Sequence, residues 1–173
     1  MRFTKMEGLG NDYIYLNCLS HRPPDPAGLA VRLSDRHFGV GADGLICVCP
    51  GRRGDFAMEM YNADGSRGKM CGNGIRCLGK YVYDKGLTRR TSLQVDTDSG
   101  LRALRLLPGP AGIGQVEVDM GEPSVFPQIS IPLMELTYSV MPVSMGNPHC
   151  ILFCPHPEEI ALVESTSHGL NIA

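Results

Sequence analysis

The stretch MCGNGIRCLGKYVYDKGL, residues 70–87, decides how the chain is expected to fold. Its apolar residues recur at the three- and four-residue spacing of one helix face: Ile75, Leu78, Tyr81 and Val82. Gly86 supplies a C-terminal stop for this helix. Because strand-like segments stand on both sides of it, we predict an α+β chain in which a mixed or antiparallel sheet wraps around a central helix.

Working outward from this helix, short runs of apolar residues bounded by Gly and Pro predict a series of strands. They are expected at residues 2–6, 12–18, 45–49, 55–61, 92–97, 101–107, 115–120, 137–144 and 150–154. Helical spacing predicts two further helices, over residues 25–38 and 156–165.

The composition excludes several classes of protein. The 173 residues carry a formal net charge of -2, which gives no reason to expect nucleic acid or an anionic membrane as partner. No apolar run approaches the length of a membrane-spanning helix. Because the N-terminal residues lack the apolar core of a signal peptide, we expect a cytoplasmic protein.

The seven cysteines form neither a disulfide framework nor a zinc signature. Their number is odd, and no pair of C-x2-C knuckles is present. We therefore predict no metal site. Cys18, Cys47 and Cys49 stand in strand-like apolar runs, where a cysteine is usually a small buried hydrophobic residue.

Residues 39–44, GVGADG, match the glycine pattern of dinucleotide-binding proteins, and Asp64 follows 20 positions after the last glycine. That fingerprint needs a strand before it and a helix after it. Here the predicted order is the reverse. We therefore interpret the segment as a glycine-rich turn from helix to strand.

Cys71 stands directly before a Gly-Asn-Gly segment that opens the central helix. The unpaired backbone N–H groups and the positive end of the helix dipole at this place favour a thiolate, and they can also bind a substrate carboxylate. These residues alone do not decide between a reactive Cys71 and a structural one. Cys77, one turn into the helix beside the apolar face, is expected to be packed and inert.

Five blocks of the sequence together resemble the diaminopimelate epimerase family, in that family's order and at compatible spacings across nearly the whole chain. The blocks are KMEGLGNDY (5–13), GVGADGL (39–45), YNADGS (61–66), MCGNGIRC (70–77) and SMGNPHC (144–150). The resemblance implies a cofactor-independent isomerase of lysine synthesis that converts LL- to meso-2,6-diaminopimelate. Inverting an α-carbon without a cofactor requires a base on one face and an acid on the other, and thiols can fill both roles.

The matching motifs imply roles for individual residues. Cys71 would be one of the two acid/base thiols, and His149 would sit close to the reacting centre. The substrate's amino and carboxylate groups would be bound by Asn11, Asn62, Gly72, Asn73 and Asn147. Each asparagine can instead be a turn residue, and this alternative is strongest for Asn62.

The sequence departs from the family at three places. Glu7 stands where the family often has histidine, and Gly44 where some members place a substrate-contacting glutamine. The family's second, pseudo-symmetric half carries another Cys-Gly-(Ser/Thr)-Gly segment, which these 173 residues lack. We expect a first domain at 1–115 and the beginning of a second at 116–173, as in a truncated epimerase that is inactive alone.

Two alternatives stay open at this stage. The chain could belong to a related proline-racemase-like or phenazine-biosynthesis-like isomerase, or be an inactive fragment that only binds a ligand or a partner. The resemblance names diaminopimelate as the small-molecule partner, calls for no cofactor and allows a homodimer.

Overall fold

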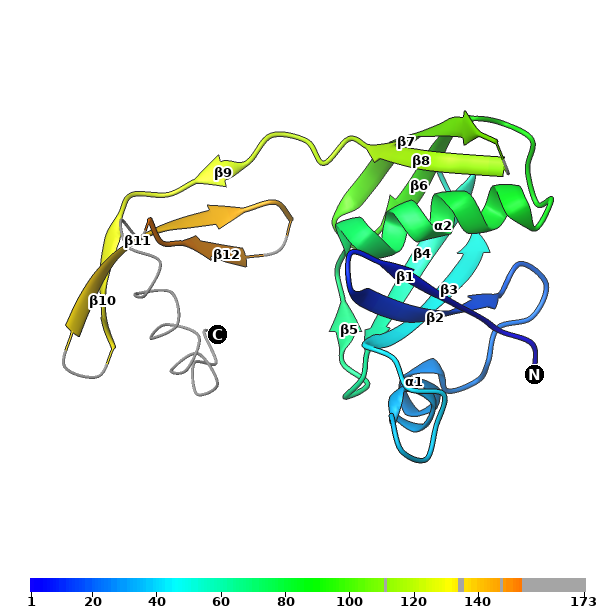
Figure 1. The fold of residues 1–173 in the computed structure, drawn as a ribbon, viewed down its shortest axis with the longest axis horizontal. Coiled ribbons are helices and arrows are strands. Elements are labelled where there is room, and N and C mark those ends of the chain that lie inside the picture. The colour runs from blue at the N-terminus through cyan, green and yellow to red at the C-terminus, as the bar shows by residue number, and fades with distance from the viewer. Residues whose placement is uncertain (111, 134–135, 147, 154–173) are drawn as a thin grey trace. The chain divides into compact units, whose positions relative to one another are not determined.

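A computed structural model gives the structure of the protein and describes residues 1–110, 112–133, 136–146 and 148–153 (Figure 1). The chain divides into two compact units, the first Met1–Met120 and the second beginning at Gly121. The boundary predicted between residues 115 and 116 concerns the family's pseudo-symmetric repeat and stays a prediction. Each unit is described by itself.

The first unit is built on one large curled sheet in the order β1-β2-β3-β4-β6-β7-β8, with the short β5 beside β4. The strands are β1 Thr4–Gly8, β2 Asn11–Asn17, β3 Gly44–Pro50, β4 Phe56–Asn62, β5 Arg67–Gly68, β6 Ser92–Thr97, β7 Gly100–Gly109 and β8 Gly112–Val118. The pairs β2/β3 and β4/β6 are parallel, and the other pairs are antiparallel. The sheet is therefore mixed, as predicted.

Helix α2, Gly72–Asp84, lies along the inner face of this sheet (Figure 1). Its apolar residues Ile75, Leu78 and Val82 are fully buried. They form one cluster with alternating inward residues from β2, β3, β4, β6, β7 and β8. The helix predicted from the opening stretch and the sheet wrapped around it are both confirmed.

Helix α1, Pro26–Ser34, covers part of the outer face, where it packs on β3 and neighbouring strands. It ends four residues earlier than predicted because Asp35 stops it. The Asp35 carboxylate accepts hydrogen bonds from the backbone N–H groups of His37 and Phe38, at 2.7 and 2.8 Å. Residues 39–44 then lead from α1 into β3, so the helix-to-strand interpretation of GVGADG is confirmed.

Strands β1 and β2 form the predicted hairpin around EGLGN. The two turn residues, Leu9 and Gly10, have φ angles of 56° and 82°. This left-handed pair matches the twist of antiparallel strands. Leu9 is therefore a non-glycine residue in a conformation that usually selects glycine.

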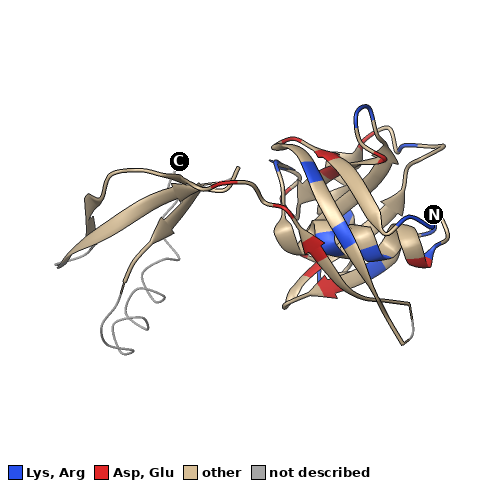
Figure 2. Cartoon of the chain, turned by 90° about the horizontal axis from the view of Figure 1, so that it is seen from above, with Lys and Arg blue, Asp and Glu red and all other residues tan. Residues whose placement is uncertain are grey.

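Basic and acidic residues are interspersed over the strands and loops of the first unit (Figure 2). Several pair across neighbouring segments, such as Arg67 with Asp98 and Arg105 with Glu117. Mixed and paired charge of this kind is typical of a solvated surface and does not resemble a nucleic-acid footprint.

The second unit contains four antiparallel strands in its described part: β9 Ser124–Val125, β10 Ile129–Leu133, β11 Leu136–Ser144 and β12 Pro148–Ile151. The sequence predicted β11 but missed β9 and β10, and β12 begins two residues earlier than expected. The helix predicted over 156–165 lies outside the described residues. No helix in the described ranges is long and apolar enough to cross a membrane.

Candidate active site

One row of residues across three strands builds the sheet side of the site. In the strand register Tyr13 of β2 pairs with Gly44 of β3, which in turn pairs with Asn62 of β4. Side chains paired in this way share a face, and the face of Tyr13 is the inner one, toward α2. Asn11 stands two residues before Tyr13 on the same face.

Cys71 is the N-cap residue of α2. Its φ and ψ of -134° and 117° are extended, its thiol accepts the Gly74 N–H at 3.3 Å, and its carbonyl accepts the Ile75 N–H at 2.9 Å. A thiol thus takes the place usually held by a serine or aspartate oxygen. The first-turn N–H groups and the helix dipole there favour negative charge, both on a thiolate and on a bound carboxylate.

The first turn of α2 is fixed to β2 by Tyr15. The fully buried Tyr15 hydroxyl donates a 2.9 Å hydrogen bond to the Gly74 carbonyl. Burial raises the pKa of Tyr15 well above its ordinary value, so the hydroxyl remains a donor. The start of the helix, and with it Cys71, is therefore held at a defined position over the sheet.

Two side chains of β2 approach the Cys71 thiol. Its sulfur lies 4.0 Å from the Asn11 amide oxygen, in a contact that the S–H group can donate to. Burial first, and then the nearby Cys71, raise the pKa of the Tyr13 hydroxyl well above its ordinary value. The sequence indicated Cys71 and Asn11 but missed Tyr13, since a tyrosine in an alternating strand is usually a core residue.

The two asparagines among the other predicted substrate contacts of the first unit have local partners. The Asn62 side chain donates to the Ser66 hydroxyl at 2.9 Å, within the turn of residues 62–66. This contact agrees with the alternative prediction that Asn62 is a turn residue. The Asn73 side-chain oxygen accepts a bond from Arg76. Gly72 is open, because a Cβ added there would meet no atom closer than 3.7 Å. The substrate roles of these residues stay predictions.

The departures from the family at Glu7 and Gly44 have a local explanation. The Glu7 carboxylate accepts a hydrogen bond from the Gly10 N–H and so closes the β1–β2 turn. A Cβ at Gly44 would lie 2.2 Å from the Tyr61 carbonyl oxygen and 2.9 Å from the Tyr13 ring. A glutamine therefore does not fit at position 44 on this backbone.

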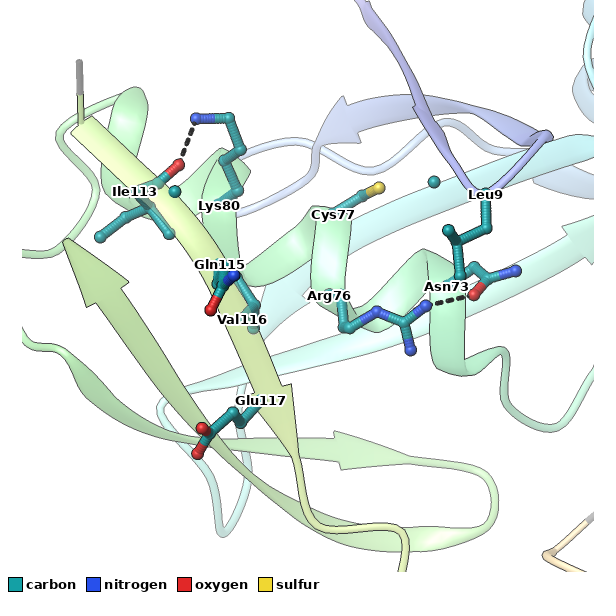
Figure 3. A pocket seen from close by; sticks show the side chains of 11 residues that line it. Leu9, Asn73, Arg76, Cys77, Lys80, Ile113, Gln115, Val116 and Glu117 are labelled. Atoms are coloured by element: carbon teal, nitrogen blue, oxygen red, sulfur yellow. Dashed lines mark hydrogen bonds between the residues drawn. The ribbon is translucent and has the colours of Figure 1, made fainter. Parts of the chain in front are cut away.

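Cys77 faces a different space. It lines a cavity of about 420 Å³ between the β1–β2 turn and β8, with α2 as its floor (Figure 3). The thiol is half-buried rather than fully buried, and this burial raises its pKa. Gly8 passes close by, since a Cβ there would lie 3.2 Å from the sulfur. Cys71 is not among the residues that line this cavity.

Of the two predicted site residues in the second unit, one is described. His149 is an exposed residue of β12, paired with Val143 of β11. Asn147 lies outside the described residues. Within the ranges that the structure describes, no three His, Cys, Asp or Glu side chains come together as metal ligands would.

The sequence matches known proteins over most of its length. The family model for diaminopimelate epimerase matches residues 3–126. The diaminopimelate epimerase of Acetivibrio thermocellus is 46% identical over 167 residues, covering 88% of this chain and 59% of the relative. That of Methanococcus maripaludis strain C5 is 42% identical over 176 residues, covering 94% and 63%. The chain spans less than two thirds of the length of these relatives.

Solved structures share the fold. A probable proline racemase from Agrobacterium radiobacter K84 superposes with a TM-score of 0.70 at 13% identity, covering 94% of this chain and 56% of that one. A hydroxyproline epimerase from Agrobacterium vitis gives 0.65 at 15% identity, with the same coverages. At such identities the likeness shows the fold alone, and it confirms the predicted architecture.

Proposed function

Because the chain belongs to the diaminopimelate epimerase family, we propose that its protein interconverts LL- and meso-2,6-diaminopimelate without a cofactor, in lysine biosynthesis. The observation that carries the proposal is the placement of Cys71. Its thiol caps the helix that is central to the fold, and the amide of Asn11 lies 4.0 Å away. The names of the sequence relatives favour diaminopimelate over proline as substrate.

The proposed chemistry is proton transfer through two thiols. One cysteine, as thiolate, removes the α-proton from one face, and a second, as thiol, returns a proton to the opposite face. The N–H groups of Gly72 and Asn73 would hold the substrate carboxylate and stabilise the charge that develops next to it. Asn11, Asn62 and Asn147 would bind its polar groups, with His149 near the reacting carbon.

The partner thiol is not another cysteine of the described first unit. Cys18, Cys47 and Cys49 pack on the outer face of the sheet, and Cys77 faces the cavity beside β8. We therefore propose that the first unit supplies one acid/base group of the pair. A cytoplasmic location and a homodimer belong to the same proposal.

Deuterium uptake tests this assignment. The 173-residue chain is incubated with LL-diaminopimelate in D2O, and NMR follows both the α-proton and the stereochemistry. We expect exchange at one α-carbon without inversion, because a lone thiol removes and returns the proton on one face. Cys71→Ala should lower the exchange rate by roughly 10²- to 10⁴-fold, the usual contribution of a general base.

Cys77→Ala is the matched control, since it removes a thiol from the same helix, and it should retain exchange. Binding without exchange would replace the proposal with a ligand-binding role. Conversion to the meso form at the rate of a whole epimerase would contradict the two-thiol assignment.

A further inference from the structure

A second cavity of the first unit, of about 610 Å³, lies at the outer face of the sheet. This outer cavity is bounded by residues 18–22, the loop that follows β3, outward residues of β4 and residues 96–98. Cys18 and Cys49 line it, and both belong to the cluster on the outer face. Cavities of this size hold small organic molecules. Cys71 is not among its lining residues, so the outer cavity is separate from the candidate active site.

The lining of the outer cavity is strongly charged. It contains four arginines and three carboxylates, which are Arg22, Arg52, Arg53, Arg67, Glu59, Asp96 and Asp98. Two of the carboxylates are paired with arginines. Glu59 accepts a hydrogen bond from Arg22 at 2.9 Å and lies 3.3 Å from Arg67, which also donates to Asp98 at 2.6 Å. Arg22 and Arg67 are therefore already engaged by these two carboxylates.

The third carboxylate, Asp96, is satisfied by the backbone of the loop after β3. It accepts the N–H groups of Arg52, Arg53 and Gly54 at 2.7, 3.0 and 3.1 Å. The bond from Arg53 first, and then those from Gly54 and Arg52, lower the pKa of Asp96. The loop is also tight, since a Cβ at Gly51 would lie 2.0 Å from the Gly54 carbonyl oxygen. Two adjacent arginines are thus carried on a fixed backbone at the cavity.

The guanidinium groups of Arg52 and Arg53 have no hydrogen bond or ion pair within the described ranges. The charge of Arg53 contributes to the lowered pKa of Asp96, but the two side chains form no ion pair. A phosphate ester suits such a pair of cations, because it offers three acceptor oxygens and a charge of about -1.5 to -2 at pH 7. Arginine matches phosphate geometry through two parallel N–H donors.

The cavity beside β8 differs in this respect, because both of its cations have partners. Arg76 donates to the Asn73 side chain. Lys80 lies 2.8 Å from an Asp84 carboxylate oxygen and donates to the Ile113 carbonyl at 2.8 Å. Of the two cavities, the outer one therefore presents the cationic groups that are available to a ligand.

We propose that the outer cavity binds a small phosphorylated molecule, with its phosphate at Arg52 and Arg53 and its organic part in the space beside Pro50 and Ala57. The site lies at the face of the sheet opposite α2, and the inference does not rest on a role for Cys71. A ligand of this kind adds a binding site to the first unit that is independent of the proposed epimerase chemistry.

The test is isothermal titration calorimetry of the 173-residue chain at low ionic strength, with ribose 5-phosphate, inorganic phosphate, ribose and succinate as probes. We expect ribose 5-phosphate to bind most tightly, inorganic phosphate more weakly, and ribose not at all. Succinate, a dianion without a phosphate group, should bind more weakly than ribose 5-phosphate. Equal binding of succinate, or no binding of ribose 5-phosphate, would overturn the inference.

Replacement of the two free arginines tests where the phosphate lies. The double variant Arg52→Gln, Arg53→Gln should weaken the binding of ribose 5-phosphate at least about tenfold, because hydrogen bonds to a charged group are lost. The matched control is Arg2→Gln, Arg89→Gln, which removes the same charge from exposed residues that do not line the cavity. Its affinity should stay within about twofold. Equal losses in both double variants would show an effect of net charge alone and contradict the site.

Ala57→Leu tests where the organic part lies. Ala57 is a half-buried residue of β4 in the lining, and a larger side chain there takes up cavity space. The binding of ribose 5-phosphate should weaken, whereas that of inorganic phosphate should stay unchanged. Circular dichroism of each variant shows that the fold is retained. An unaltered affinity for ribose 5-phosphate in a folded Ala57→Leu chain would contradict this placement.

The outcome is separable from that of the proposed function. The titrations contain no diaminopimelate, whereas deuterium uptake reports on the reaction at Cys71. Exchange without phosphate binding would remove the outer site and keep the epimerase chemistry. Phosphate binding without exchange would do the opposite.

Discussion

The two faces of the large sheet differ in how completely they are covered. On the inner face, α2 packs against residues from β2 through to β8 in one cluster. On the outer face, α1 covers residues of β2, β3 and β4. Outward residues of β6, β7 and β8, such as Gln94, Arg105 and Glu117, are exposed. The same sheet is therefore a core wall on one side and partly a solvated surface on the other.

The cysteines of the first unit are likewise divided between the two faces of the sheet. Cys18, Cys47 and Cys49 are packed in the outer cluster, and the neighbouring Cys47 together with burial raises the pKa of Cys18 to about 12. Cys71 and Cys77 belong to the inner helix, and only Cys71 stands at its N-terminal end. Of these five thiols, only Cys71 has the first-turn N–H groups of a helix beside it, which is the setting that the proposed chemistry requires.

The largest effect on stability is expected from Ile75→Ala on the inner helix. Ile75 is fully buried between α2 and the sheet, so its truncation should lower the free energy of unfolding by about 2–5 kcal/mol. Leu29→Ala on α1, where the side chain is half-buried, should cost distinctly less. Urea denaturation followed by circular dichroism measures both. Equal losses of unfolding free energy in the two variants would mean that the two faces contribute equally to stability.

Gly79→Ala tests how closely α2 approaches the sheet. The added Cβ would lie 2.9 Å from Leu106 and 3.0 Å from Leu104, both core residues of β7. Overpacking of about 1–3 kcal/mol should outweigh the gain of about 1 kcal/mol in helix propensity. We therefore expect a net loss of stability by thermal denaturation.

Gly28→Ala in α1 is the matched substitution on the outer face. There the nearest atom to an added Cβ is an Asp25 carboxylate oxygen at 2.1 Å. This side chain caps α1 by accepting the Gly28 N–H, so turning it away costs about 1 kcal/mol, which the gain in helix propensity offsets. Its effect should be smaller than that of Gly79→Ala. The reverse order of the two losses would contradict the closer packing of the inner face.

Asp12→Asn should remove an ion-pair network from the outer face. Asp12 accepts two bonds from Arg36, at 2.8 and 3.2 Å, and contacts Lys5 at 3.0 Å. Arg36 first, and then Lys5, hold the pKa of this carboxyl well below its ordinary value. Because the folded-state pKa is lowered, the stabilisation is present above the unfolded-state value and is lost as pH falls toward the folded-state value.

The variant should therefore lose about 1–2 kcal/mol at pH 7, somewhat below the usual value of about 1.5–3 kcal/mol for hydrogen bonds to charged groups, because the Arg36 side chain is 55% exposed. The difference from the unchanged chain should narrow below about pH 4, near the ordinary pKa of an aspartate. Urea midpoints at pH 7, 5 and 3 measure this. A difference that stays constant with pH would show that the ion pairs do not stabilise the fold.

Much of this architecture was predictable from the sequence, because its causes are local. Helix α2 follows from apolar spacing and a glycine stop, and the longer strands follow from alternation. Strands β5 and β9 were missed because two residues carry no periodicity. The end of α1 was placed too late, since Asp35 stops the helix through bonds to the next residues' N–H groups.

The site was predictable only in part. The helix N-terminus at Cys71 could be recognised from the Gly-Asn-Gly segment, whereas the acid/base role of Cys71 is implied only by the family resemblance and stays a prediction. The position of Tyr13 opposite Gly44 could not be predicted, since it depends on β2 lying in parallel register beside β3. A sequence shows which residues alternate, but it does not show which strands become neighbours. The pairing of segments that are distant in the sequence could therefore not be predicted from the sequence alone.

The smallest effect is expected where the outer face is uncovered. Arg105 of β7 and Glu117 of β8 are cross-strand partners at 2.7 Å, and their side chains are 67% and 53% exposed. Since solvent and salt screen an exposed pair, Glu117→Gln should cost roughly 0.2–1 kcal/mol. The loss should shrink further at high salt. Urea denaturation at low and high ionic strength measures both values. A larger, salt-independent loss would show that this part of the face is shielded from water, and the contrast between the two faces would then not hold.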